Sequence, residues 1–128
     1  MMDITVVIPL YNKEKEITRA LESVRCQTLQ PSEVLVVDDG STDNSAAMVR
    51  DLSLPALRLI SQENAGQHGA RNRGIAEAKG DLVAFLDADD QWEPGFLNAV
   101  ATMRERYPQC GMYAVAIRHC DAKGRFHY

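Results

Sequence analysis

Three aspartates directly follow a short apolar run, at a spacing that suits a divalent cation. The run begins near residue 81, and Asp87, Asp89 and Asp90 come at its end. Its valine, phenylalanine and leucine residues, and its shortness, predict a buried strand rather than a helix. In extended backbone Asp87 and Asp89 lean to the same side, where two carboxylates repel each other unless a cation lies between them or one pKa rises. Such oxygen ligands suit Mg²⁺ or Mn²⁺, ions that also bind substrate phosphates.

An earlier acidic pair, Asp38 and Asp39, offers a second set of acceptors. The pair follows the apolar run at residues 34–37 and precedes Gly40. One interpretation is a turn followed by a helix cap, for which Asp-Gly-Ser is common. The other is that one carboxylate, which has only acceptors, binds a base or a ribose. Because uracil has an N3–H donor where cytosine has an acceptor, such a carboxylate favours uridine. The pair alone leaves both interpretations open.

Tyr11, Gly66 and Arg71 carry groups that could complete a nucleotide site. Tyr11 follows the apolar run at residues 4–8 and could stack on a base. Gly66 lies in a loop that leads into a helix, and the free N–H groups at a helix amino terminus can bind phosphate. Arg71 could add a bidentate contact, although a solvated arginine in the first turn of a surface helix fits the spacing equally well.

Composition narrows the class of protein. The chain has 128 residues and a formal net charge of −4, which fits one domain with a hydrophobic core. The acidic balance argues against general binding to nucleic acid or to an anionic membrane. No apolar run approaches the roughly 20 residues of a membrane-spanning helix, and the first four residues lack the basic flank of a signal peptide. Three cysteines that match no metal pattern indicate reduced thiols in a cytoplasmic protein.

The elements that position these residues alternate between strands and helices. Apolar runs predict strands, and amphipathic or small-residue segments between them predict helices. The expected strands lie at residues 4–8, 34–37, 57–60, 81–86 and 112–117, and the expected helices at residues 13–28, 46–52, 70–79 and 94–107. We expect Pro9 to end the first strand and Gly80 to follow the third helix as its C′ residue. Residues 121–124 resemble a hairpin turn, with a returning strand from Arg125 to Tyr128.

Alternation of this kind implies right-handed crossovers and an α/β fold. We expect a Rossmann-like, doubly wound, mostly parallel sheet with helices on both faces and the strand order 3-2-1-4. Ligands bind such sheets beyond the carboxyl ends of the strands, where the strand order reverses. That switch point, between the first and fourth strands, would place Tyr11, Asp38, Asp39, Asp87 and Asp89 along one crevice.

Four stretches together resemble glycosyltransferase family 2, which has the nucleotide-sugar-binding fold called A-type. They are VVIPLYN at residues 6–12, VVDDGSTD at 36–43, ENAG with ARN at 63–66 and 70–72, and FLDADD at 85–90. Each is moderately specific alone, but all four occur in this order and at this spacing, and the likeness covers nearly the whole chain. The resemblance implies an inverting transferase that uses a nucleoside-diphosphate sugar, most often a UDP-sugar, together with Mn²⁺ or Mg²⁺.

The resemblance also implies a role for each matching residue. Nucleotide-binding residues would be Pro9, Tyr11, Asp38, Asp39, Gly66, Arg71 and Asp87. Metal-binding residues would be Asp89, Asp87 and Asp90. In this scheme Asp87 contacts the ribose, and Asp89 binds the ion that bridges the diphosphate. The ion's role is to neutralise the charge that builds on the departing UDP.

Family members continue well past Tyr128, and their acceptor site and general base lie in that continuation. We therefore expect residues 1–128 to be the amino-terminal, nucleotide-sugar-binding domain of a longer transferase, which binds the donor but does not transfer sugar. The resemblance implies a glycan or lipid-linked acceptor in polysaccharide or cell-envelope synthesis. It also implies a cytoplasmic location, at the inner face of the membrane.

Two other classes of protein fit part of the pattern. A phosphatase of the haloacid dehalogenase type also has Asp-x-Asp after a strand, with the first Asp as nucleophile, but that strand comes early in its core rather than fourth. The second alternative is a non-catalytic fragment that binds a nucleotide or associates with itself. An unfinished sheet edge at residues 112–117 could pair with another copy and form a homodimer.

Overall fold

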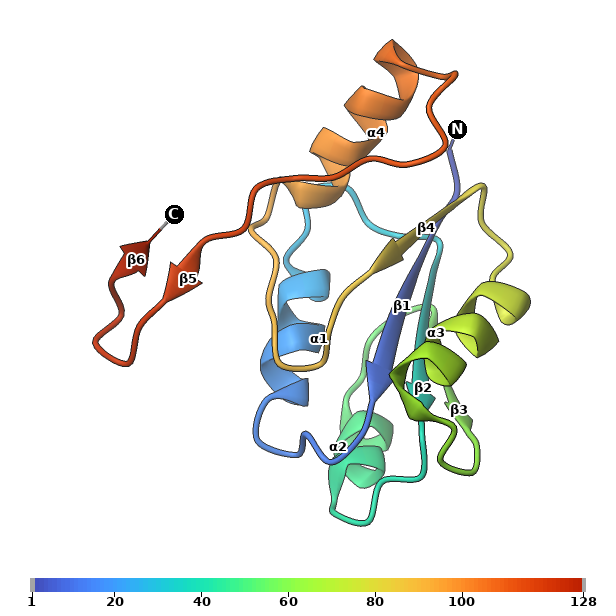
Figure 1. The fold of residues 1–128 in the computed structure, drawn as a ribbon, viewed down its shortest axis with the longest axis vertical. Coiled ribbons are helices and arrows are strands. Elements are labelled where there is room, and N and C mark those ends of the chain that lie inside the picture. The colour runs from blue at the N-terminus through green and yellow to red at the C-terminus, as the bar shows by residue number, and fades with distance from the viewer. Residues whose placement is uncertain (1, 128) are drawn as a thin grey trace.

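The computed structural model describes residues 2–127 and contains a four-stranded sheet (Figure 1). Its strands are β1 (Ile4–Leu10), β2 (Glu33–Asp38), β3 (Leu57–Ser61) and β4 (Leu82–Phe85). Their order is β3-β2-β1-β4 and every pairing is parallel, which confirms the predicted fold class and strand order. Because the strands run in one direction, the segments that follow β1, β2 and β4 all leave the sheet at the same end, the carboxyl end of the strands.

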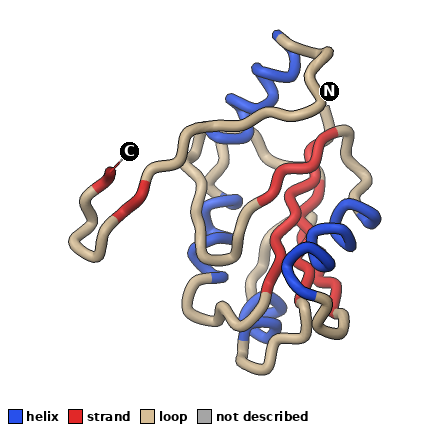
Figure 2. The backbone as a smooth tube through the Cα atoms, viewed as in Figure 1, coloured by secondary structure: helices blue, strands red, loops and turns tan. Residues whose placement is uncertain are grey.

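Helices cover both faces of the sheet, as Figure 2 shows. They are α1 (Ile17–Arg25), α2 (Ser45–Asp51), α3 (Gly66–Glu77) and α4 (Phe96–Arg106). The first two and α4 share one apolar core with β1 and β2, whereas α3 packs against the opposite face. Both α1 and α4 begin later than the predicted residues 13 and 94. None of the helices in residues 2–127 has the length and apolar character needed to cross a bilayer.

β1 continues through Pro9 to Leu10, so the prediction that Pro9 ends this strand is wrong. Leu10 O accepts a hydrogen bond from Asp39 N at 2.8 Å, whereas Val7 O accepts one from Leu86 N at 3.0 Å. Alternate residues of β1 therefore bond to opposite neighbours, and Pro9 turns its nitrogen toward the β4 side. The pairing between β1 and β4 stops at Val7, so the missing N–H of Pro9 removes no ladder hydrogen bond.

Two glycines at the ends of α3 act differently from the prediction. The helix begins at Gly66 rather than at residue 70, and the positive φ of Gly66 (+81°) turns the preceding loop into the helix. Gly80 is not the C′ residue, because Ala78 is already the C-cap. A Cβ on Gly80 would lie 2.7 Å from Asp3 O and 2.8 Å from Thr5 N. Gly80 is therefore required for the close approach of this loop to β1.

The predicted strand at residues 112–117 does not form. This segment has no strand partner within residues 2–127, and Met112 and Ile117 are 84% and 74% exposed. Its β-branched residues favour a strand only where a neighbouring strand offers a ladder. The segment instead leads to a separate antiparallel hairpin, β5 (His119–Cys120) and β6 (Phe126–His127), which projects away from the main sheet (Figure 1). The hairpin turn is confirmed, and Tyr128 lies outside the described residues.

Candidate functional site

A pocket of about 520 Å³ lies beyond the carboxyl ends of β1, β2 and β4. It is lined by Pro9, Leu10, Tyr11, Lys13, Asp39, Asn64, Gly66, Gln67, Ala70, Asp87, Ala88 and Asp89. Most of the candidate residues found in the sequence thus come together at the expected switch point. A smaller hollow of about 340 Å³ between α2 and β3 is lined by leucines and has no carboxylate. We therefore place the candidate site at the larger pocket.

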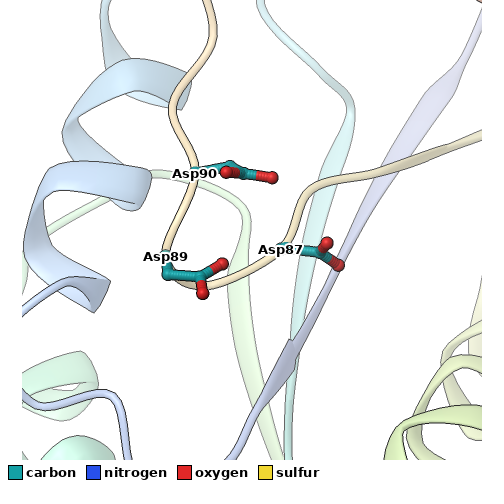
Figure 3. A group of neighbouring side chains, drawn as sticks. All are labelled: Asp87, Asp89 and Asp90. Carbon is teal, nitrogen blue, oxygen red and sulfur yellow. The ribbon is translucent and has the colours of Figure 1, made fainter. Parts of the chain in front are cut away.

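Asp87, Asp89 and Asp90 lie on one turn of the chain beside this pocket, with the side chains of Asp89 and Asp90 directed toward Asp87 (Figure 3). Asp90 N donates a hydrogen bond to Asp87 O at 3.0 Å, and this turn brings the three side chains together. One oxygen from each carboxylate lies within 4.8 Å of the others. Loss of hydration, and then the charges of Asp89 and Asp87, raise the pKa of the Asp90 carboxyl above its ordinary value. Three clustered carboxylate oxygens are a donor set that fits a hard divalent cation.

Basic and amide side chains already contact this acidic cluster. Arg71 donates to Asp87 Oδ1 at 2.9 Å, and Gln67 Nε2 donates to the same oxygen at 3.3 Å. Lys13 Nζ lies 3.5 Å from Asp89 Oδ2. Arg71 itself is not part of the pocket lining, so it reaches the pocket through Asp87. These contacts balance part of the negative charge that the three carboxylates place at the pocket.

The adjacent residues Asp38 and Asp39 have different surroundings, although both are buried. Asp39 lines the pocket, and its Oδ1 accepts hydrogen bonds from Ala65 N at 2.8 Å and Gln62 Nε2 at 2.9 Å. Asp38 is absent from the lining, and its Oδ1 accepts from Ser41 N at 3.1 Å. Asp38 therefore stabilises the turn after β2, whereas Asp39 presents a carboxylate to the pocket.

The loops that follow β1 and β2 are joined by side chains, which fixes Tyr11 at the pocket. Asn12 has a positive φ of 49°. Its Oδ1 accepts from Thr42 N at 2.8 Å, and its N donates to Ser41 Oγ at 3.0 Å. Tyr11, next to this joint, lines the pocket and is 48% exposed. An aromatic ring held at a pocket wall with half its surface free can stack on a planar ligand.

The amino terminus of α3 forms another wall of the pocket through Gly66, Gln67 and Ala70. Its N-cap, Ala65, makes no side-chain capping bond. The first turn of this helix therefore leaves N–H groups and the positive end of the helix dipole on the pocket side, which favours an anion there.

Three polar residues of the pocket lining are not among the residues predicted from the sequence: Lys13, Asn64 and Gln67. Lys13 was interpreted as the start of a helix, yet it belongs to the loop before α1. Asn64 and Gln67 lie in the glycine-containing loop, and Asn64 belongs to the ENAG stretch of the family resemblance, but the sequence predicts no role for either side chain. Their positions beside Gly66, in a segment expected at the strand ends, are the signal that could have identified them.

A family model for glycosyl transferase family 2 matches residues 5–127. An uncharacterized glycosyltransferase of Nostoc sp., alr2836, is 46% identical, and the match covers 77% of this chain and 32% of that protein. The succinoglycan biosynthesis protein ExoW of Rhizobium meliloti is 42% identical, with 95% of this chain and 40% of that protein covered. The chain thus spans well under half the length of these relatives.

Solved structures similar to this chain support the same family assignment. TarS of S. aureus in complex with UDP-GlcNAc superposes with a TM-score of 0.74 at 34% identity, over 84% of this chain and 32% of TarS. TarS in complex with UDP superposes equally well, at 33% identity. The parallel sheet with its flanking helices is therefore the A-type glycosyltransferase fold, and the chain belongs to glycosyltransferase family 2.

Proposed function

We propose that residues 1–128 form the amino-terminal, donor-binding domain of an inverting glycosyltransferase that uses a UDP-sugar and a divalent cation, Mn²⁺ or Mg²⁺. The observation that carries this proposal is the Asp87, Asp89 and Asp90 cluster beside a pocket that also contains Asp39 and Tyr11. Binding of UDP and UDP-GlcNAc by TarS, a structural neighbour, supports the choice of nucleotide. The family assignment gives no support to the phosphatase alternative.

The nucleoside is assigned to the part of the pocket nearest β1 and β2. Asp39 would accept the N3–H of uracil through Oδ2, which accepts no hydrogen bond from residues 2–127. Its Oδ1 is already held by one backbone donor, Ala65 N, and one side-chain donor, Gln62 Nε2. Tyr11 would stack on the base and Pro9 would lie beside it. Asp38 would act indirectly, by holding the turn that places Asp39.

The diphosphate is assigned to the region between the acidic cluster and α3. Asp89, Asp87 and Asp90 would hold the divalent ion, which when bound neutralises negative charge on the departing UDP. N–H groups of the α3 amino terminus, starting at Gly66, would face the phosphates. Arg71 would hold the Asp87 carboxylate in place near the ribose.

The acceptor is assigned to chain outside these 128 residues. No residue of the pocket is proposed as the general base, which the family resemblance assigns to a position beyond Tyr128. We propose that the 128-residue chain binds donor nucleotide and does not transfer sugar, and that the whole protein acts on a glycan or lipid-linked acceptor at the cytoplasmic face of a membrane.

Calorimetric titration of UDP, GDP and CDP, each with and without Mn²⁺, tests the proposal. UDP should bind most tightly and only with Mn²⁺, and Asp89→Ala should abolish this binding. Asp81→Ala is the matched control, because Asp81 precedes β4 at the opposite end of the strand and should leave binding unchanged. Binding that ignores Mn²⁺, or that survives in Asp89→Ala, would contradict the proposed metal site.

A further inference from the structure

The segment that follows the acidic cluster is held along its length by α1 and the residues just after it. Residues 86–95 form no helix or strand. Arg19 donates to Asp89 O at 2.8 Å, and Ser23 Oγ accepts from Trp92 N at 3.1 Å. Thr28 N donates to Pro94 O at 2.9 Å. Successive residues of α1, and then Thr28 after it, therefore bond to successive residues of the loop.

Gln27 makes the most extensive of these contacts and is only 5% exposed. Its Nε2 donates to Glu93 O at 2.7 Å, and its Oε1 accepts from Leu97 N at 2.9 Å. Leu97 N belongs to the first turn of α4, whose N-cap, Gly95, has no side chain to cap it. Gln27 therefore supplies the missing cap from another part of the chain and at the same time fixes the loop that precedes the helix.

Packing reinforces the same attachment. The rings of Trp92 and Phe96 stack with centroids 4.3 Å apart, and both rings pack against the core that contains α1. The carboxyl-terminal end of the loop, between Trp92 and Leu97, is thus anchored. Asp87 is anchored on the other side, because β4 ends at Phe85 and Leu86 N still bonds to β1.

We propose that Gln27 and Ser23 are positioning residues for the metal site, an inference that rests on the proposed function. Three carboxylates repel one another, so a free loop would separate them. Mg²⁺ demands near-ideal octahedral geometry, which a loop fixed at both ends can present and a loose one cannot. The hydrogen bonds from Gln27 and Ser23 fix the carboxyl-terminal end of this loop, and neither residue lines the pocket or belongs to the acidic cluster.

The variant Gln27→Met tests this role, because it keeps the side-chain length and removes both hydrogen bonds to the loop. Mn²⁺-dependent UDP affinity should fall by about 10-fold to 100-fold, the usual loss when a group that orients metal ligands is removed. Binding of uridine without metal, measured by NMR titration, should not change, since uridine is assigned to the pocket wall that contains Asp39 and Tyr11.

Two controls separate positioning from general destabilisation. Gln30→Met removes a neighbouring glutamine whose amide donates to Arg25 O and Gln27 O, neither of which belongs to the loop. Val49→Ala removes buried volume on α2, away from the loop. Both controls, measured below their melting temperatures, should keep wild-type affinity for UDP with Mn²⁺.

Trp92, the only tryptophan in the sequence, gives a spectroscopic readout of the loop. Its emission should shift to longer wavelength in Gln27→Met, and to a lesser degree in Ser23→Ala, which serves if Gln27→Met does not fold. Wild-type affinity in a folded Gln27→Met or Ser23→Ala would overturn this inference alone, as would an equal loss of uridine binding. A wild-type chain without Mn²⁺ dependence would overturn the proposed function and this inference with it.

Discussion

Asp39→Asn should weaken the binding of UDP and strengthen the binding of CDP. The wild-type side chain is held through Oδ1, which accepts hydrogen bonds from Ala65 N and Gln62 Nε2. Because both partners are donors, an asparagine must place its carbonyl oxygen at that position. Its NH₂ group then takes the place of Oδ2, and a donor faces the pocket where an acceptor was.

The expected magnitude follows from the single interaction that is reversed. A hydrogen bond to a charged group contributes about 1.5–3 kcal/mol. At about 1.4 kcal/mol for each tenfold change in Kd, UDP should bind about 10-fold to 150-fold more weakly to Asp39→Asn. CDP should bind more tightly than it does to the wild type, because N3 of cytosine accepts the new donor.

The assay is titration of UDP and CDP, both with Mn²⁺, into the wild type, Asp39→Asn and Asp38→Asn. Asp38→Asn is the matched control, since Asp38 carries the same chemical change one residue away and does not line the pocket. It should lower the affinities for the two nucleotides equally or not at all. If Asp39→Asn weakens UDP and CDP by the same factor, the assignment of Asp39 to the base is wrong.

Two further predictions concern stability. Gly74→Ala should lower the free energy of unfolding by about 1–3 kcal/mol in calorimetry, because a Cβ there would lie 2.3 Å from Val7 Cγ1; Gly95→Ala, which meets nothing within 4 Å, should change it by less than about 0.5 kcal/mol. Burial would raise the pKa of Glu33, but hydrogen bonds from the backbone and from Arg58 hold that pKa below its ordinary 4.5. Glu33 therefore stabilises the fold above pH 4.5, and this stabilisation is lost as pH falls through the lowered pKa. The free energy of unfolding of Glu33→Gln, measured by urea titration, should fall less steeply with decreasing pH than that of the wild type.

The strand order and the location of the pocket could be predicted because they depend on local patterns. Each parallel strand is a short apolar run, and polar residues follow three of these runs directly. Asp38 and Asp39 are both expected along the crevice, yet of the two only Asp39 lines the pocket. The sequence could not say which of them does, because the direction of a side chain depends on how the strand sits in the sheet.

The missed contacts are long-range ones. Gln27 bonds to residues 66 and 70 positions away in the chain, and no local pattern marks a glutamine after a helix as the cap of another helix. The strand prediction at residues 112–117 was wrong for a related reason. The β-propensity is a property of the segment alone, but a strand also needs a neighbouring strand with unpaired backbone N–H and C=O groups.

The three carboxylates of the cluster are not equivalent, and their differences suggest how the loop folds without an ion. Asp87 pairs with Arg71 and Asp89 pairs with Lys13, whereas no residue from 2 to 127 forms a salt bridge with Asp90. The pKa of Asp90 is also the one that is raised. Two basic side chains therefore offset two of the three charges, and Asp90 keeps the least compensated one. A divalent cation would compete with Lys13 and Arg71 for the same oxygens, which would free both side chains to face the phosphates of a bound nucleotide.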